Sequence, residues 1–539
     1  MKRVLLSLIA ALAIAFMAMY AVHAVFCLAY PHQLEYGEGL CMALTRRIID
    51  AGTLYNDPSA KPWLICEYTP LFFLLCSVLS GGNLTFFIGR MVSFVSFLSV
   101  AGLIIFYCGR FGRCEGKKSG KSTEAVKKAG REFLYLGAGG WVAAALIFCD
   151  SVQAFWSVLF RIDLLGILLS FLGLFFADKI CRRVYLGRRA NFIHVLLSAI
   201  CLTLAFFTKQ SLVSALAASS ITLLLINKKA AWEYISVCGI LLGTGLLMLQ
   251  MFFGDKFLFV MLNCTGMYWT FARFSEYSFS YWIWKLPLAV MAIFALKHLW
   301  PAEKLWCLYA VICFLTVPSV GRAGSYYNYF LEPCLALTVL AGLYANYLWK
   351  ADNKHGQVFF NAALAAVLAQ SALGFWTGFD GGAVSMEKLC RNEIVPVLTG
   401  SYPQDRACEK ELMDEVMKAA AEIVLPDGSV KQARETEFVK IPVLAEDMGC
   451  FVAEGYEVWL VDPATYCDLE HMGIYDFSEL DNLIANNYFA LIEINDMYRS
   501  DRLPSSAIKS IKEHYRPARG IAGKKLFVPI SAAFSENRR

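Results

Sequence analysis

Long apolar runs, separated by short basic clusters, constrain the fold of this chain more than any other feature. Eleven runs are long enough, or nearly so, for a helix to cross the roughly 30 Å hydrocarbon core of a bilayer. They lie at 4–28, 84–108, 133–149, 164–177, 191–207, 211–226, 233–252, 279–299, 303–319, 329–349 and 357–375. Because 58% of the residues are hydrophobic and only 17% are charged, a soluble globular domain is excluded. The sequence predicts a polytopic α-helical membrane protein.

A shorter apolar run at 68–80 decides the topology, because a crossing there would reverse the side of every later loop. The run holds about 13 residues, too few to cross a bilayer as a helix. If it does not cross, about twenty Lys and Arg residues fall on the side of the N-terminus, against about ten in the opposite short loops. We therefore expect a juxtamembrane helix at 68–80, a cytoplasmic N-terminus and an extracytoplasmic C-terminus. The run at 4–28 is longer than the core of a cleaved signal peptide, so we interpret it as a retained first span.

The chain divides into two expected domains. Residues 1–375 form the transmembrane domain, and its first outer loop, 29–67, is rich in acidic and aromatic residues. We expect an amphipathic helix in this loop, from Gly39 to Ala51. Residues 376–539 are more polar and alternate helical patterns with short β-rich runs, which predicts a small α/β extracytoplasmic domain. The β-rich runs lie at 439–445, 457–461, 489–494 and 525–530.

The cysteine and charge patterns exclude several kinds of site. The 18 cysteines form no C-x-x-C pair and no array with zinc-ligand spacing, so the sequence indicates no cofactor and leaves a divalent metal open as an alternative. An oxidising compartment would permit a disulfide among the four cysteines of the C-terminal domain, Cys390, Cys408, Cys450 and Cys467. The net charge of +5 arises from basic clusters between apolar runs, which membrane orientation explains. No nucleic-acid partner is expected.

Two acidic residues open the first outer loop, in the segment L34-E-Y-G-E-G39. Carboxylates as close as Glu35 and Glu38 can raise each other's pKa, which favours a role in accepting a proton. The alternative is that both are ordinary solvated loop acids. Downstream follow the amphipathic helix, G52-T-L-Y55, and then E67-Y-T-P70 at the start of the short apolar run.

This order of segments resembles the first outer loop of GT-C glycosyltransferases, of the protein-mannosyltransferase and aminoarabinose-transferase type. The resemblance continues at R161-I-D-L-L165, T208-K-Q210 and G321-R-A-G-S-Y-Y-N-Y-F-L-E332, and it covers most of the chain to about residue 375. The predicted topology places these segments at outer helix ends. The resemblance implies an inverting transfer of a sugar from a polyprenyl-phosphate donor to an acceptor hydroxyl.

The resemblance also implies the catalytic acids. Glu38 best matches the first-loop general base, with Glu35 as the alternative, because the family often has an Asp-Glu pair where this chain has Gly37 before Glu38. Asp163 would be a second acid that orients the acceptor or the first loop. Asp163 could instead simply pair with Arg161, since charges at the end of a membrane helix are costly unless they are paired or functional.

The remaining polar residues of these segments are candidates for binding substrate. Lys209 could neutralise the donor phosphate, although its side chain could also extend to lipid headgroups. Arg322 could bind the same phosphate through two hydrogen bonds. The expected substrate-binding residues are Lys209, Arg161, Arg322, Tyr68, Asn328 and Glu332.

The function predicted from these residues is a membrane glycosyltransferase, a hexosyl- or pentosyltransferase of the cell envelope. Its partners would be a polyprenyl-phosphate sugar, an extracytoplasmic acceptor that is a lipid, a polymer or a protein, and membrane lipids. One alternative is a flippase or transporter for a lipid-linked saccharide, which would require internal pseudo-symmetry and charges near the membrane midplane. Another is a non-catalytic protein whose external domain binds glycan.

Overall fold

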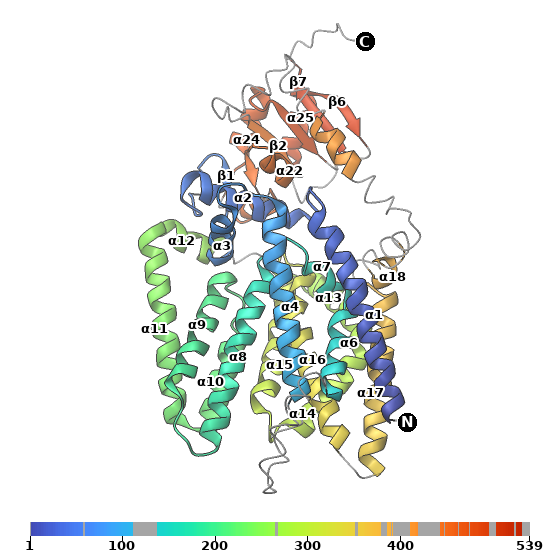
Figure 1. Cartoon of the computed structure of the whole chain (residues 1–539). Coiled ribbons are helices and arrows are strands. Elements are labelled where there is room, and N and C mark those ends of the chain that lie inside the picture. The colour runs from blue at the N-terminus through green and yellow to red at the C-terminus, as the bar shows by residue number, and fades with distance from the viewer. Residues whose placement is uncertain are drawn as a thin grey trace.

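The computed structural model is a bundle of membrane helices with a mixed α/β domain at one end (Figure 1). It describes residues 2–57, 60–110, 137–264, 268–350, 354–378, 385–389, 391, 410–418, 442–446, 448–461, 463–473, 475–494, 503–521 and 524–530. The N-terminus and the C-terminal domain lie at opposite ends of the bundle.

Each of the eleven apolar runs predicted to cross the membrane coincides with a helix in the described residues. These helices are α1 (Lys2–Ala29), α4 (Phe86–Arg110), α6 (Ala138–Phe148), α8 (Asp163–Tyr185), α9 (Phe192–Thr208), α10 (Ser214–Ile226), α11 (Lys228–Phe253), α14 (Leu286–Leu299), α15 (Lys304–Thr316), α16 (Leu331–Lys350) and α17 (Lys354–Trp376). Within the described residues, eight helical stretches are long and apolar enough to span a bilayer, whereas α6, α9 and α10 are shorter apolar helices. The prediction of a polytopic membrane protein is confirmed.

Shorter helices connect the membrane helices or lie at their ends. They are α7 (Ser151–Trp156), α12 (Asp255–Phe259), a π-helical turn η3 (Val260–Cys264), α13 (Phe271–Trp282), α18 (Met386–Leu389) and the 3-10 turns η4 (Ile283–Lys285), η5 (Val317–Gly321) and η6 (Tyr327–Phe330). Helix α13 runs through η4 into α14, so this span starts earlier than the apolar run at 279–299.

The first outer loop contains two helices whose ends follow from local chemistry. Helix α2 (Tyr36–Ala51) begins where the Glu35 carboxylate accepts a hydrogen bond from the backbone N–H of Gly37. It ends at Gly52, whose φ of 64° is in the left-handed region that favours glycine. Helix α3 (Leu71–Ser80) follows Pro70 and has 10 residues, which agrees with the short juxtamembrane helix expected at 68–80.

The C-terminal domain contains a five-stranded mixed sheet of order β3-β2-β5-β7-β6. Strand β2 pairs in parallel with β3 and β5, whereas β7 pairs antiparallel with β5 and β6. The elements are β2 (Pro442–Ala445), α22 (Met448–Ala453), β3 (Glu457–Val458), β4 (Leu460–Val461), α23 (Pro463–His471), α24 (Ser478–Ala485), β5 (Leu491–Ile494), α25 (Ser505–His514), β6 (Tyr515–Ile521) and β7 (Lys524–Pro529). The four predicted β-rich runs all overlap strands, and β6 is an additional one.

The first outer loop joins the C-terminal domain to the membrane helices. Strand β1 (Trp63–Leu64) pairs in parallel with β4, Trp63 pairing with Leu460. The Trp63 side chain is fully buried and packs edge-on against Trp459. Helix α22 packs against α2, and its Gly449 N–H donates to Oε1 of Gln33 at 3.1 Å. The first outer loop is thus in contact with both the membrane helices and the C-terminal domain.

The cysteines are mainly small apolar packing residues. Cys450 and Cys467 are both buried. Cys390 and Cys408 lie outside the described residues.

Candidate functional site

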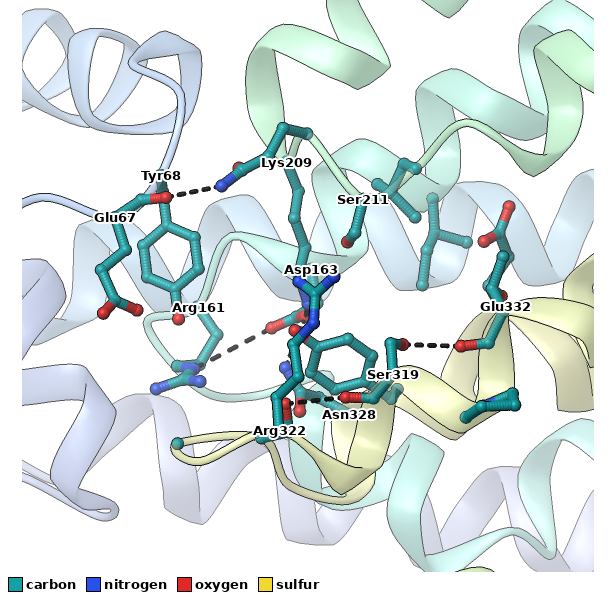
Figure 2. Close-up of a pocket in the computed structure, with 18 of the residues that line it drawn as sticks. Glu67, Tyr68, Arg161, Asp163, Lys209, Ser211, Ser319, Arg322, Asn328 and Glu332 are labelled. Atoms are coloured by element: carbon teal, nitrogen blue, oxygen red, sulfur yellow. Dashed lines mark hydrogen bonds and ion pairs between the residues drawn. The ribbon is translucent and has the colours of Figure 1, made fainter. Parts of the chain in front are cut away.

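A cavity of about 610 Å³ lies at the end of the bundle that faces the C-terminal domain. Five segments form its wall: the end of the first outer loop, the start of α8, the break between α9 and α10, Trp269 before α13, and the segment from the end of α15 to α16. Its polar lining residues include Glu67, Tyr68, Arg161, Asp163, Lys209, Gln210, Ser211, Ser319, Arg322, Asn328 and Glu332 (Figure 2). These segments are far apart in sequence, so the fold itself brings the polar residues together.

Asp163 lies at the centre of a buried ionic cluster (Figure 2). Its Oδ1 atom is 2.6 Å from the Nζ of Lys209 and accepts a hydrogen bond from the Nδ2 of Asn328 at 2.9 Å. Its Oδ2 atom accepts no hydrogen bond within the described residues, and the Nε of Arg161 is 3.9 Å away. One carboxylate oxygen is therefore engaged, whereas the other is buried without a hydrogen-bond donor among the described residues.

Lys209 reaches Asp163 because the chain changes direction there. Helix α9 ends at Thr208, and Lys209 adopts an extended conformation before α10 begins at Ser214. The ammonium also lies over the ring of Tyr329, 4.7 Å from its centroid, which is a favourable cation–π distance. The ammonium of Lys209 thus lies beside Asp163 in the cavity wall.

Arg161 links Asp163 to the first outer loop. Its Nη1 atom lies 3.4 Å from Oε2 of Glu35. A Cβ atom at Gly37 would be 1.2 Å from the same Nη1, so the guanidinium occupies the space that a side chain at this position would need. Burial raises the pKa of the Glu35 carboxyl, and the positive charge of Arg161 opposes that rise.

Glu38 lies outside the cavity, in a fully buried ion pair with Arg90 of α4. The Nε and Nη2 atoms of Arg90 lie 2.8 Å and 2.7 Å from the two carboxylate oxygens. The backbone N–H groups of Leu34 and Phe160 also donate to this carboxylate, each at 2.7 Å. Because protein donors surround both oxygens, Glu38 connects the first loop, α4 and the segment before α8.

Arg90 extends this connection through the backbone of the first loop. Its guanidinium donates to the carbonyl oxygens of Cys27, Tyr30 and His32. Sequence reasoning missed Arg90, although a single arginine within the apolar run 84–108 is costly unless it has a partner. The cost of placing this arginine in the membrane indicates that it has a buried acidic partner.

The other predicted binding residues also line the cavity. Arg322 follows η5, and the backbone on either side of it pairs with the segment before α13 through Thr270 and Ala323. Glu332 is buried, and its Oε1 accepts a hydrogen bond from the Tyr309 hydroxyl at 2.9 Å. Tyr68 lines the cavity as well, and its carbonyl oxygen accepts from the hydroxyl of Tyr55 at 2.7 Å.

Glu67 is a cavity residue that sequence reasoning did not select. Its Oε1 atom accepts a hydrogen bond at 2.9 Å from the hydroxyl of Thr465, on α23 of the C-terminal domain. Its carbonyl oxygen accepts from the Nε2 of Gln210 at 2.6 Å. The motif E67-Y-T-P70 does not mark its acid as a site residue, and only the fold shows that Glu67 belongs to the cavity wall.

Asp163, Arg161, Lys209, Arg322, Tyr68, Asn328 and Glu332 thus meet at one cavity. Glu35 and Glu38 are not among its lining residues, although Glu35 contacts Arg161, which lines the cavity. The cations of this cavity can bind a phosphate, and the buried carboxylate beside them can accept a proton.

Two solved structures share this fold. ArnT from Cupriavidus metallidurans bound to undecaprenyl phosphate aligns with a TM-score of 0.53 and 13% sequence identity, over 96% of this chain and 98% of that chain. The apo state of ArnT from the same organism aligns with a TM-score of 0.52 and 12% identity, over 95% and 97%. No protein-family model matches the sequence, and no curated protein is significantly similar to it.

At this level of identity, the likeness establishes the fold. The chain is a membrane protein with the architecture of the GT-C type of integral membrane glycosyltransferase, and this confirms the fold implied by the sequence resemblance. The structural neighbour is an aminoarabinose transferase of that type, and the alignment includes both the membrane helices and the C-terminal domain.

Proposed function

We propose that this protein transfers a sugar from a polyprenyl-phosphate-linked donor to an extracytoplasmic acceptor. The observation that carries the proposal is the cluster of Asp163, Arg161 and Lys209 in a cavity of a GT-C fold. The neighbour with the same fold is bound to undecaprenyl phosphate, which supports a polyprenyl phosphate as the lipid carrier.

Lys209, Arg161 and Arg322 bind the donor phosphate. All three cations line the cavity, and positive charge there stabilises the phosphate oxygen that becomes negative as the bond to the sugar breaks. Arginine suits this role because its planar guanidinium can hold two phosphate oxygens at once. Tyr68 and Tyr329 offer aromatic faces to a sugar or an isoprenoid chain.

Asp163 is the general base. The oxygen of the acceptor hydroxyl attacks the anomeric carbon, the bond from that carbon to the phosphate oxygen breaks, and the proton passes to Oδ2 of Asp163. The products are the glycosylated acceptor, with inverted anomeric configuration, and the free polyprenyl phosphate. Asn328 holds Oδ1 of Asp163, and Oδ2 has no hydrogen-bond donor among the described residues, so it keeps its capacity to accept a proton.

This assignment differs from the one made from the sequence, in which Glu38 was the base. Glu38 has no path to a substrate in the cavity without breaking its ion pair with Arg90. We assign Glu38 to holding the first loop in place. Glu35 positions the guanidinium of Arg161. Glu67 can accept hydrogen bonds from the hydroxyl groups of the acceptor.

The proposed orientation follows from the distribution of basic residues. The N-terminus is cytoplasmic, and the C-terminal domain and the cavity face the extracytoplasmic side. The acceptor would then approach from the C-terminal domain, which contacts the cavity wall through Thr465.

The proposal is tested by supplying the purified protein in detergent with sugar-labelled undecaprenyl phosphate and measuring sugar release or transfer. Asp163→Asn is expected to lower kcat by on the order of 100-fold or more, because a general base contributes about 10²–10⁴-fold. Undiminished turnover in Asp163→Asn would contradict the assignment of Asp163 as the general base. Translocation of the donor in vesicles without cleavage would contradict the enzyme and support a flippase.

A further inference from the structure

A second cavity, which the proposed reaction does not use, is lined by helix ends. Figure 1 shows that these helix ends lie opposite the C-terminal domain. Its volume is about 730 Å³, within the roughly 300–1,000 Å³ typical of ligand sites. The walls are the C-terminal ends of α4, α8 and α10 and the turn between α14 and α15.

One wall of this cavity is a built polar network around Arg182. Its Nε atom donates to Oδ2 of Asp178 at 2.7 Å, and its Nη2 donates to Oε2 of Glu303 at 2.8 Å. The same Nη2 atom reaches the hydroxyl of Tyr107 at 2.9 Å. Both acids are buried, and Arg182 forms an ion pair with each of them.

Two further cations, Arg110 and Lys304, line the cavity, and no ion pair involves either of them among the described residues. The guanidinium of Arg110 lies over the ring of Phe106, 4.4 Å from its centroid. Arg110, Arg182 and Lys304 against Asp178 and Glu303 leave the lining with a net positive charge. An anion is therefore the ligand that this cavity favours.

An apolar groove adjoins the cavity on the sides of α4 and α8. Leu98, Gly102, Leu168 and Leu172 line it, and Phe106 belongs to both the groove and the cavity. A Cβ atom at Gly102 would meet no other atom within 4 Å, so the groove is open at that point. A positively charged cavity that shares a wall with an apolar groove matches a molecule with an anionic head and a long apolar chain.

We propose that the cavity and the groove bind one anionic phospholipid of the leaflet opposite the C-terminal domain. Its phosphate lies near Arg110 and Lys304, where charge-assisted hydrogen bonds are strong, and an acyl chain lies in the groove between α4 and α8. The groove favours a lipid over a soluble phosphate, which would leave these apolar side chains without a partner. The lipid would hold together helix ends that also position Asp163, at the other end of α8.

The test measures lipid binding to the purified full-length protein by native mass spectrometry, with phosphatidylglycerol as the probe. Arg110→Ala with Lys304→Ala is expected to weaken binding by about tenfold or more, because each basic residue near a lipid phosphate contributes on the order of fivefold. Lys228→Ala with Lys229→Ala is the matched control, because both lysines are exposed at the same end and outside the cavity. Lys304→Arg should keep wild-type affinity and shows that the site tolerates substitution at this position.

Two further binding measurements distinguish a lipid ligand from a soluble anion. Gly102→Leu fills the groove and is expected to weaken binding of phosphatidylglycerol, and phosphatidylcholine should bind less well than phosphatidylglycerol in wild type. Displacement of the lipid by an equal concentration of glycerol phosphate would overturn the lipid assignment. Equal binding by wild type and the Arg110→Ala, Lys304→Ala double variant would overturn the site.

Discussion

The Nζ of Lys209 lies 2.6 Å from Oδ1 of Asp163, and both side chains are buried beside the cavity. Without a donor, this ion pair neutralises the two charges that the proposed reaction needs. A phosphate entering the cavity would compete with Asp163 for the ammonium. Donor binding and activation of the base are therefore linked through one contact.

Replacing Lys209 should weaken donor binding. Lys209→Ala removes a buried positive charge, and we expect the Kd for undecaprenyl phosphate to rise by about 10- to 100-fold, as for loss of a charge-assisted hydrogen bond in a desolvated site. Binding can be measured by native mass spectrometry or by competition with a labelled lipid. Lys256→Ala is the control, because Lys256 is exposed and lies outside the cavity lining. Unchanged affinity in Lys209→Ala would contradict the phosphate role.

Adding a methyl group at Gly37, which does not line the cavity, should displace the lining residue Arg161. The new Cβ would occupy the position of the Arg161 guanidinium, which must then move away from Glu35 and Asp163. We expect Gly37→Ala to lower kcat/KM for the donor by at least about tenfold, since 1.4 kcal/mol of lost interaction is tenfold. Gly239→Ala is the matched control, because its Cβ would meet open space and it lies outside the cavity lining. Wild-type kinetics in Gly37→Ala would show that the position of Arg161 does not matter.

Glu38 and Arg90 should be coupled in stability. Breaking a fully buried ion pair leaves one unpaired charge, which costs about 3–5 kcal/mol. We expect Glu38→Gln and Arg90→Met each to lower the thermal unfolding temperature, and the double variant to lose less than the sum of the two. A double-mutant cycle measures this coupling. If Glu38→Gln kept wild-type stability but lost turnover, the catalytic role predicted from the sequence would be supported instead.

The membrane fold was largely predictable, because lipid imposes a strong rule on sequence. A helix that crosses hydrocarbon needs a long apolar run, so the positions of α1, α4 and α17 are visible without a structure. Strand β6 was missed because Arg516, Pro517 and Gly520 break the alternation of apolar and polar residues that marks a strand.

The candidate site was less predictable, because sequence order does not show which polar groups face each other. Asp163 and Lys209 were selected as charges at helix ends, and they do meet. Glu38 was selected for its motif, but its partner Arg90 is 52 residues away and within an apolar run. Thr465 carries no motif at all, and its contact with Glu67 arises only from the docking of the C-terminal domain.

The stability of the C-terminal domain should depend on pH through Glu493. Burial, together with the nearby Glu446, raises the pKa of the Glu493 carboxyl to about 8. The unfolded chain has a glutamate pKa of about 4.3, so the folded domain binds an extra proton between these values. Stability from this group is present below about pH 4 and is lost as the pH rises toward 8. Burial also lowers the pKa of Lys524 to about 8, so this lysine changes the pH dependence of stability only above about pH 8.

Thermal unfolding of the domain between pH 5 and pH 8 tests this dependence. We expect Glu493→Gln to flatten the decline in unfolding temperature and to stabilise the domain by several degrees at pH 8, at about 2–4 °C per kcal/mol. Glu513→Gln, at an exposed acid, should behave like wild type. Equal slopes in Glu493→Gln and wild type would contradict the assignment.

The most direct test of the central claim is a structure of the protein with undecaprenyl phosphate, determined by cryo-electron microscopy. The account predicts density for the lipid phosphate inside the cavity, within hydrogen-bonding distance of Lys209 and of Arg161 or Arg322, with the ion pair from Lys209 to Asp163 loosened. Phosphate density outside this cavity, with Asp163 and Lys209 still paired, would contradict it.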